Sequence, residues 1–200
     1  MTAGGRSMRR FAAVTFPISA SEIRKVRAHL KGGGLIAYAT ESCYGLGCDP
    51  RNRRAVQRLL RLKQRPQSRG LLLIADRFER LAPFVAPLDA QQRTSLQQWW
   101  PGPFTLLLPA SRRTPRWLRG SHDSIGVRVT AHPEAASLCR RLNMALVSSS
   151  ANRSGLRPLK TCADCTRAFG RDVLVLRGKI GKRKSPSTII DFKNGRLIRK

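Results

Sequence analysis

The sequence predicts a single-domain α/β protein, and three observations lead to this class. Apolar, β-branched runs alternate with segments of helical periodicity along the chain, which is the element order of an α/β sheet. Several of these runs are continuously apolar, as in strands that are covered on both faces. The 200 residues contain no Gly/Ser-rich or Pro-rich linker, so we expect one domain over residues 1–200.

The N-terminal part predicts a tail, a helix and two strands. We expect a flexible tail at 1–10 and a first strand at 11–16. Ser21 could cap a helix that runs to Leu30, because apolar residues recur there at helical spacing and three glycines follow. The next apolar run, at 35–39, reads as a buried strand.

The middle of the chain begins with a loop at 40–49, whose two glycines would let a ligand approach the backbone. A Gly-x-Gly sequence can equally be a simple tight turn. Asn52 could cap a second helix, and a strand is expected at 71–74. The segment 75–101 predicts helical or irregular structure, and its Trp-Pro-Gly-Pro end predicts a turn into a strand at 104–108.

The last third continues the alternation. A strand is expected at 125–129, and Pro133 suits the first turn of a helix that continues to Leu142. After a strand at 145–148, Thr161 could cap a short helix through Phe169. The remaining predicted strands span residues 173–176 and 187–192.

The balance of charge is the unusual property of this composition. The chain has 39 Lys and Arg against 11 Asp and Glu, a formal net charge of +28. A polyanion such as RNA, or a nucleotide, would relieve the resulting self-repulsion. The alternative is a generally arginine-rich composition in which the excess charge only covers the surface.

Cysteine usage and hydropathy predict a cytoplasmic protein. Five cysteines form an odd set without the spacing of a disulfide scaffold, and the C-x-x-C at Cys162 and Cys165 lacks a second ligand pair for zinc. No apolar run approaches the length needed to cross a bilayer. Three histidines without ligand spacing and few carboxylates predict no metal site made by the protein.

Lys63 and Arg65 form a K-x-R pair at the end of the second predicted helix. They would diverge on a continuing helix, but Pro66 is expected to end the helix at Arg65, so both could converge on one ligand. A lysine point charge and an arginine fork suit a triphosphate, and we expect both side chains to face solvent in the cavity. A solvated basic helix face is the alternative.

Polar side chains also gather at the ends of predicted strands. Ser148, Ser150 and Asn152 stand where the strand at 145–148 ends, and Ser187 stands at the lip of the last strand. These groups could hold phosphate or ribose, or act as ordinary turn and cap residues. Arg128 lies inside an apolar strand, where a buried guanidinium requires an anion.

Six motifs appear in order along nearly the whole chain: A-T-E-S-C-Y-G-L-G-C-D at 39–49, L-K-Q-R-P at 62–66, W-P-G-P-F-T at 100–105, V-R-V-T-A-H-P at 127–133, S-S-S-A-N-R-S-G at 148–155 and S-P-S-T-I-I-D at 185–191. Together they resemble the YrdC/TsaC family of threonylcarbamoyl-adenylate synthases, in its short bacterial form. The resemblance implies an open, twisted, mixed α/β sheet with flanking helices around a concave, basic cavity.

The resemblance also implies an activity. Such a nucleotidyltransferase makes L-threonylcarbamoyl-AMP and pyrophosphate from L-threonine, bicarbonate and ATP. The product serves N6-threonylcarbamoyladenosine at position 37 of tRNAs that read ANN codons. ATP would be a substrate that carries Mg²⁺, with no tightly bound cofactor, and separate proteins would transfer the group to tRNA.

The same resemblance assigns roles to residues. Lys63 and Arg65 would hold the ATP phosphates and act in catalysis, and Ser148, Ser150 and Asn152 would belong to the same nucleotide site. The threonine pocket would be lined by Thr40, Arg128 and Ser187, with Arg128 on the amino-acid carboxylate.

A non-catalytic RNA-binding or ribosome-maturation protein is the alternative from another class, and the high positive charge supports it directly. Such a protein needs stacking aromatics, which make up only 6% of this chain, and has no need of an arginine in a buried strand. Weak binding of tRNA or double-stranded RNA is expected under either hypothesis, whereas insertion in a membrane is not.

Overall fold

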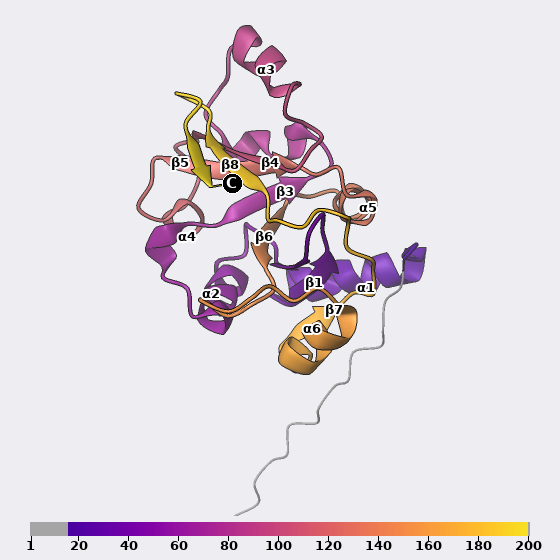
Figure 1. Ribbon diagram of the computed structural model, residues 1–200. Helices are drawn as coiled ribbons and strands as arrows, with labels where there is room; N and C mark the ends of the chain where they lie inside the picture. The colour runs from indigo at the N-terminus through magenta and orange to yellow at the C-terminus, as the bar shows by residue number, and fades with distance from the viewer. Residues whose placement is uncertain (1–15, 200) are drawn as a thin grey trace, which may run out of the picture.

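The computed structural model describes residues 16–199. Its central element is one mixed sheet of nine strands (Figure 1). The strand order across the sheet is β7-β1-β2-β6-β3-β5-β4-β8-β9. Parallel pairs (β1 with β7, β3 with β5, β4 with β8) are mixed with antiparallel ones. The strands are β1 (Leu35–Ala39), β2 (Tyr44–Gly47), β3 (Leu72–Ala75), β4 (Phe104–Pro109), β5 (Ser124–Val129), β6 (Leu146–Ser150), β7 (Val173–Val175), β8 (Thr188–Asp191) and β9 (Leu197–Arg199).

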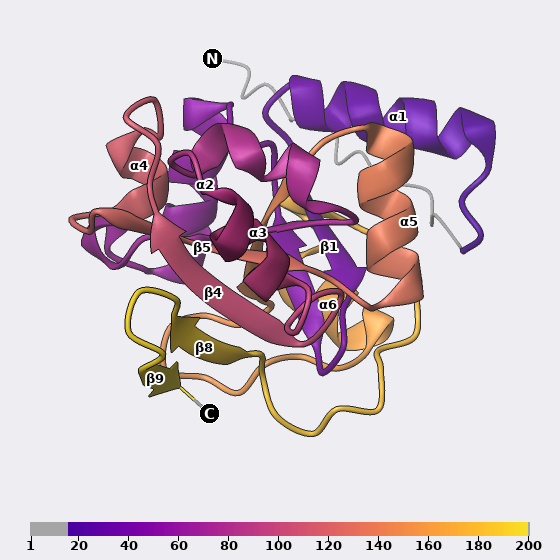
Figure 2. The same ribbon diagram turned by 90° about the horizontal axis from the view of Figure 1, so that it is seen from above.

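Helices cover both faces of this sheet. The α-helices are α1 (Ala20–Lys31), α2 (Arg53–Lys63), α3 (Ala90–Leu96), α4 (Arg116–Arg119), α5 (Pro133–Leu142) and α6 (Cys162–Phe169). Three short 3₁₀ turns are η1 (Gln67–Arg69), η2 (Phe78–Arg80) and η3 (Ala82–Phe84). Helices α1 and α5 pack on one face, where they lie side by side in Figure 2, and the buried residues of α2, α3, α4 and α6 belong to the core of the other face.

Strand β1 shows how the two cores share one sheet. Its five residues are all buried, because alternate side chains enter opposite cores. Leu35, Ala37 and Ala39 join the core under α2, while Ile36 and Tyr38 join the core under α1 and α5. The continuously apolar run in the sequence therefore does reflect a strand covered on both faces.

The structure confirms the α/β class and most predicted elements, with corrections at several boundaries. Helix α1 is capped by Ser19, not Ser21, because Ser19 and Glu22 form a capping box. Residues 44–47 of the predicted loop form β2, and β6 continues past the predicted end at 148 to include Ser149 and Ser150. Strand β9 was not predicted, and the predicted tail and the strand at 11–16 lie outside the described residues, except for Phe16.

All five cysteines are free thiols, and those of the C-x-x-C sequence lie on α6. Within the described part of the chain, no helix is long and apolar enough to cross a membrane.

Candidate active site

A cavity of about 340 Å³ occupies the part of the sheet face that α1 and α5 leave uncovered. In β3 and β6, a core residue under these helices and a residue that lines the cavity are two positions apart, on the same face of the strand. Ile74 is a core residue and Leu72 lines the cavity; in β6, the buried Leu146 is followed on the same face by Ser148 and Ser150. In β6, the side chains on this face thus change from apolar in the core to polar in the cavity wall.

Positive charge dominates the cavity wall. Five arginines and one histidine line it, and none of the lining residues is a carboxylate. The arginines come from four regions that are distant in the sequence: Arg65 and Arg69, Arg119, Arg128 and Arg199. A concave surface with this lining favours anionic ligands.

Arg65 stands where α2 gives way to a loop. The helix ends at Lys63 because Gln64 adopts a left-handed conformation, with φ of 51°, so the chain leaves the helix one residue earlier than expected. The Arg65 guanidinium donates to the carbonyl oxygens of Arg69 and Gly70 at 3.1–3.3 Å. Burial, followed by the nearby Arg69 and Arg199, lowers the pKa of Arg65, as expected where cations crowd together.

Lys63 does not face solvent, so that prediction is wrong. It lies on the buried face of α2 with Val56, Leu59 and Leu60, and only 4% of its surface is exposed. Its Nζ donates to the carbonyl oxygens of Ser150 at 2.5 Å and of Asn152 at 2.7 Å, and to Asn152 Oδ1 at 3.3 Å. Burial and the neighbouring Arg65 lower the pKa of Lys63 to about 8.

The structure brings Ser150 and Asn152 of the S-x-N sequence next to Lys63. Ser148 and Ser150 line the cavity, whereas Asn152 does not. The Ser150 hydroxyl donates to Asn152 Oδ1 at 2.6 Å, and Asn152 Nδ2 donates to the carbonyl oxygen of Leu156 at 2.6 Å. Asn152 therefore shapes the loop after β6, and the loop in turn is fixed by Lys63.

Thr40, Arg128 and Ser187 all line the cavity and are all at least nine-tenths buried. Thr40 donates through its hydroxyl to the carbonyl oxygen of Cys43 at 2.7 Å, which closes the turn between β1 and β2. The Ser187 hydroxyl accepts a hydrogen bond from Thr105 at 2.9 Å, and Arg199 donates to the Ser187 carbonyl oxygen. The three predicted residues thus share one region of the cavity.

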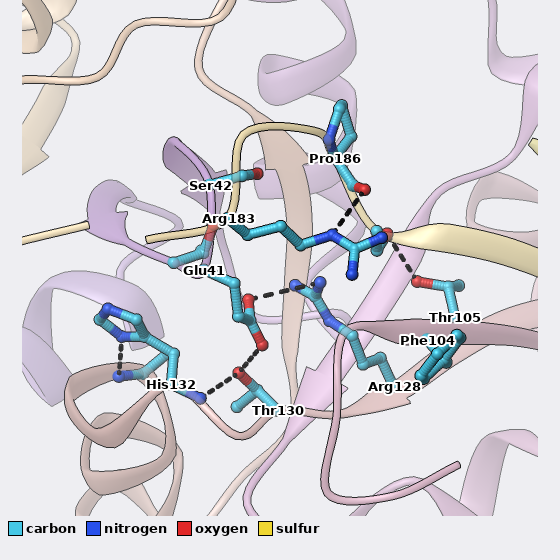
Figure 3. A network of polar contacts seen from close by, with 12 residues as sticks. Glu41, Ser42, Phe104, Thr105, Arg128, Thr130, His132, Arg183 and Pro186 are labelled. Atoms are coloured by element: carbon cyan, nitrogen blue, oxygen red, sulfur yellow. Dashed lines mark hydrogen bonds and ion pairs between the residues drawn. The ribbon is translucent and has the colours of Figure 1, made fainter. Parts of the chain in front are cut away.

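Arg128 has a counter-ion that the sequence analysis did not identify. Figure 3 shows Glu41 between Arg128 and Thr130, with Glu41 Oε2 3.4 Å from Arg128 Nη1. Glu41 Oε1 accepts a hydrogen bond from the Thr130 hydroxyl at 2.7 Å. Among the residues that the structure describes, Glu41 Oε2 and Arg128 Nε are buried atoms without a hydrogen-bond partner.

In addition to Glu41, the sequence analysis missed several residues that line the cavity, notably Arg69, Arg119 and Arg199. Arg199 reaches the site from β9, which no periodicity indicated, and Arg119 comes from a helix of one turn. Only the tertiary pairing of β8 with β9 brings Arg199 to Ser187. In so basic a sequence, no local signal distinguishes these arginines from surface ones.

Fold and site together define an α/β protein with a cavity on its sheet whose basic lining favours anionic small molecules. Comparisons of sequence narrow this class. The Sua5/YciO/YrdC family, described as "Telomere recombination", matches residues 28–200. The chain belongs to this family.

Two curated relatives share one name. A threonylcarbamoyl-AMP synthase of Chromobacterium violaceum is 57% identical over 176 residues, which cover 88% of this chain and 91% of the relative. A threonylcarbamoyl-AMP synthase of Thiobacillus denitrificans is 55% identical and is covered to 93% of its length.

Solved structures agree on the fold. P. abyssi Sua5, determined in complex with L-threonine, superposes with a TM-score of 0.84 at 29% identity. The superposition covers 94% of this chain but 56% of the Sua5 chain, so this chain spans about half of that protein. E. coli YciO gives a TM-score of 0.80 at 22% identity and is covered to 96%.

Proposed function

We propose that this protein is a threonylcarbamoyl-AMP synthase. It condenses L-threonine with bicarbonate to a carbamate, with loss of water, and the carbamate oxygen then attacks the α-phosphorus of ATP. A new C–O–P bond forms, the bond to the departing pyrophosphate breaks, and the protein thereby acts as a nucleotidyltransferase. The product serves N6-threonylcarbamoyladenosine formation at position 37 of tRNAs that read ANN codons.

The observation that carries this proposal is one cavity with two cationic ends of different character. At one end lie Arg65 and Arg69, and Arg199 lies between this end and Arg128. Besides burial, Arg69 and Arg199 lower the pKa of Arg65, and Arg128 lowers the pKa of Arg199, as expected where cations gather for a polyphosphate. At the other end, Arg128 is buried, and the buried Thr40 and Ser187 line the same cavity. The volume of about 340 Å³ falls at the lower end of small-ligand pockets, which run to about 1,000 Å³.

On the nucleotide side, we assign Arg65 to the ATP phosphates, where it offsets charge on the leaving pyrophosphate. Ser148 and Ser150 present hydroxyls to the same ligand. Lys63 and Asn152 serve this site by holding the loop after β6 in place, since Lys63 Nζ is hydrogen-bonded to that loop. Lys63 can reach a phosphate only by giving up these bonds.

On the threonine side, we assign Arg128 to the amino-acid carboxylate, with Thr40 and Ser187 beside it. A guanidinium can bind a carboxylate through two parallel hydrogen bonds, and the buried Nε of Arg128 lacks an acceptor among the described residues. Positioning and electrostatics then provide most of the rate, and no covalent nucleophile is required. Consistent with this, burial raises the pKa of the Cys43 thiol, which also lines the cavity.

Magnesium enters this scheme as part of the Mg-ATP substrate, because a hard cation prefers phosphate oxygens and water. We further propose that residues 16–199 act as one domain, since all nine strands join one sheet. The five free thiols suit the reducing cytoplasm. Downstream proteins would transfer the threonylcarbamoyl group to tRNA, and the basic surface would bind RNA weakly.

Pyrophosphate release separates this proposal from a non-catalytic RNA-binding protein. We expect release only when L-threonine, bicarbonate and Mg-ATP are all present, and without any RNA. Arg65→Ala should lose most of this activity at unchanged thermal stability. Release that is independent of threonine, or no release at all, would contradict the proposed synthase and favour the RNA-binding alternative.

A further inference from the structure

We propose that Glu41 is a positioning residue that orients Arg128 for the amino-acid carboxylate, and that Thr130 in turn orients Glu41. This inference rests on the proposed function, because it concerns the substrate end at Arg128. It assigns a role to a carboxylate that does not itself line the cavity.

The position of Glu41 beside Arg128 carries the first step. Arg128 lines the cavity, but its ion-pair partner Glu41 does not, so the carboxylate contacts the guanidinium without itself forming part of the cavity wall. Both side chains are largely buried, with exposed fractions of 9% for Arg128 and 12% for Glu41. A buried guanidinium without a counter-ion would be strongly destabilised, so Glu41 keeps this cation in the wall of the cavity.

The geometry of the pair carries the second step. Glu41 Oε2 lies 3.4 Å from Nη1 of Arg128, while Nε of the same guanidinium has no hydrogen-bond partner in the described part of the chain. The contact therefore fixes one end of the guanidinium, and the part of Arg128 that lines the cavity can donate to an incoming carboxylate.

Thr130 supplies the third step, because it fixes the carboxylate itself. Its hydroxyl donates to Glu41 Oε1 at 2.7 Å and accepts a hydrogen bond from the backbone N–H of His132 at 3.2 Å. The Thr130 N–H donates to the carbonyl oxygen of Ala75, which ties the residue to the end of β3. Figure 3 shows this chain of contacts from His132 through Thr130 and Glu41 to Arg128.

The backbone of Glu41 extends the same arrangement to the segment that carries Ser187. The Glu41 carbonyl oxygen accepts from the N–H of Arg183, and the Arg183 side chain donates to the Pro186 carbonyl oxygen and the Thr188 hydroxyl. Glu41 thus contacts Arg128 of β5 through its side chain and, through its backbone, the segment from Arg183 to Thr188 that contains Ser187.

Calorimetric titration of the purified protein tests this inference with two ligands, L-threonine and a non-hydrolysable ATP analogue, each with the other ligand absent and present. Glu41→Gln removes the charge at nearly constant shape. Thr130→Val removes the orienting hydroxyl, and Thr130→Ser keeps it. Thr114→Val is a matched control, because Thr114 is also a buried threonine whose hydroxyl is hydrogen-bonded, to the Phe84 carbonyl oxygen, and it does not line the cavity.

We expect Glu41→Gln to weaken L-threonine binding about tenfold or more, because misorientation of a ligand-binding group is costly. Thr130→Val should weaken it about three- to tenfold, the usual net contribution of one hydrogen bond. Thr130→Ser should recover most of that loss, and affinity for the ATP analogue should change less than about twofold in all variants. Thr114→Val should leave both affinities unchanged.

Two outcomes would overturn the inference, and they are distinct from failure of the proposed function. Unchanged threonine affinity in both Glu41→Gln and Thr130→Val would show that Arg128 needs no orientation. Tighter threonine binding in Glu41→Gln would show that Glu41 competes with the substrate for Arg128. If the unmodified protein binds no L-threonine, with or without the ATP analogue, the proposed function fails together with this inference.

Discussion

At the scale of single residues, Lys63 and Arg65 show how two cations separated by one residue acquire different roles. Lys63 remains on the buried face of α2 and donates to three oxygens of the loop after β6, while Arg65 follows the left-handed Gln64 into the cavity wall. The lysine therefore acts on the ligand through the protein, whereas the arginine can act on it directly.

Protonation of Lys63 should set the alkaline limit of activity. Burial lowers its pKa to about 8, so the lysine is charged below that pH and loses its charge, with one of its three donors, as the pH rises through it. We expect kcat/KM for ATP, measured at saturating threonine, to fall above about pH 8 by up to about tenfold per pH unit.

Lys63→Arg tests this assignment, since arginine keeps its charge throughout the range. The variant should have a lower maximum, but its alkaline limb should move to higher pH. If kcat/KM falls at the same alkaline pH in the unmodified protein and in Lys63→Arg, the group that titrates is not Lys63 but another residue or a substrate.

A second residue-scale prediction concerns Arg128. Arg128→Lys keeps the charge but loses the planar fork, so KM for threonine should rise about tenfold or more while KM for ATP changes less than about twofold. Arg65→Ala should show the opposite pattern, with the larger effect on ATP. An effect of Arg128→Lys on ATP alone would move Arg128 to the nucleotide side.

At the scale of elements, the close approach of β2 and β6 explains the second glycine of the Gly-x-Gly sequence. A Cβ on Gly47 would lie 2.6 Å from the carbonyl oxygen of Val147 and 2.8 Å from the ring of Tyr38. Gly47 therefore permits the approach of a neighbouring strand and an aromatic ring. Gly45 lines the cavity, so the predicted approach of a ligand applies to that glycine alone.

Gly47→Ala should lower the free energy of unfolding by about 1–3 kcal/mol, the usual cost of overpacking. Gly32→Ala is its control, because a Cβ there would lie 3.5 Å from the nearest backbone oxygens and φ is −72°, which any residue adopts. We expect Gly32→Ala to change stability by less than about 0.5 kcal/mol. Urea denaturation measures both, and equal stability of the two variants would contradict the proposed contact.

Local sequence signals predicted the elements that carry such signals. Caps and periodicity identified α2, α5 and α6, and apolar runs identified β1, β3, β4 and β5. The short β2 and β9 were missed, because their residues contain glycine or are exposed and only pairing with neighbours makes them strands. The serines of β6 were assigned to the end of a strand because they are polar. They continue the strand because they face a cavity, which the sequence does not reveal.

The sequence predicted many of the residues of the candidate site, but not the contacts among them. Motifs indicated Thr40, Arg65, Arg128, Ser150 and Ser187, which the structure brings to one cavity. The partners of Arg128 and Lys63 were not predictable, because Glu41 and the Asn152 carbonyl oxygen reach them only through tertiary packing. Exposure of Lys63 was predicted wrongly since nothing in the sequence indicates that backbone oxygens can satisfy a buried ammonium.

At the scale of the whole molecule, most of the positive charge lies outside the cavity. The formal charge is +28, whereas five arginines line the cavity. The outer face of α2 is one place where the excess is found, with Arg54, Arg58 and Arg61 exposed at helical spacing. Such a surface suits a polyanion and is independent of the chemistry in the cavity.

Binding of tRNA should therefore be weak, insensitive to sequence and strongly dependent on salt. Counterion release predicts a loss of affinity of about tenfold or more between about 50 and 200 mM salt. Filter binding with tRNA and an unrelated double-stranded RNA measures this. If RNA binding is absent or insensitive to salt, the excess charge reflects only an arginine-rich composition. If pyrophosphate release requires tRNA, the outer basic surface and the cavity do not act independently.

The central claim is that one cavity joins threonine, bicarbonate and ATP into a mixed carbamate–phosphate product. Mass spectrometry of the reaction with carbon-13-labelled bicarbonate tests it most directly, with samples taken early because the product is labile. The proposed function predicts threonylcarbamoyl-AMP that carries the label, formed in equal amount with pyrophosphate and lost in Arg128→Lys at low threonine. Formation of AMP and pyrophosphate without a labelled adenylate would contradict it.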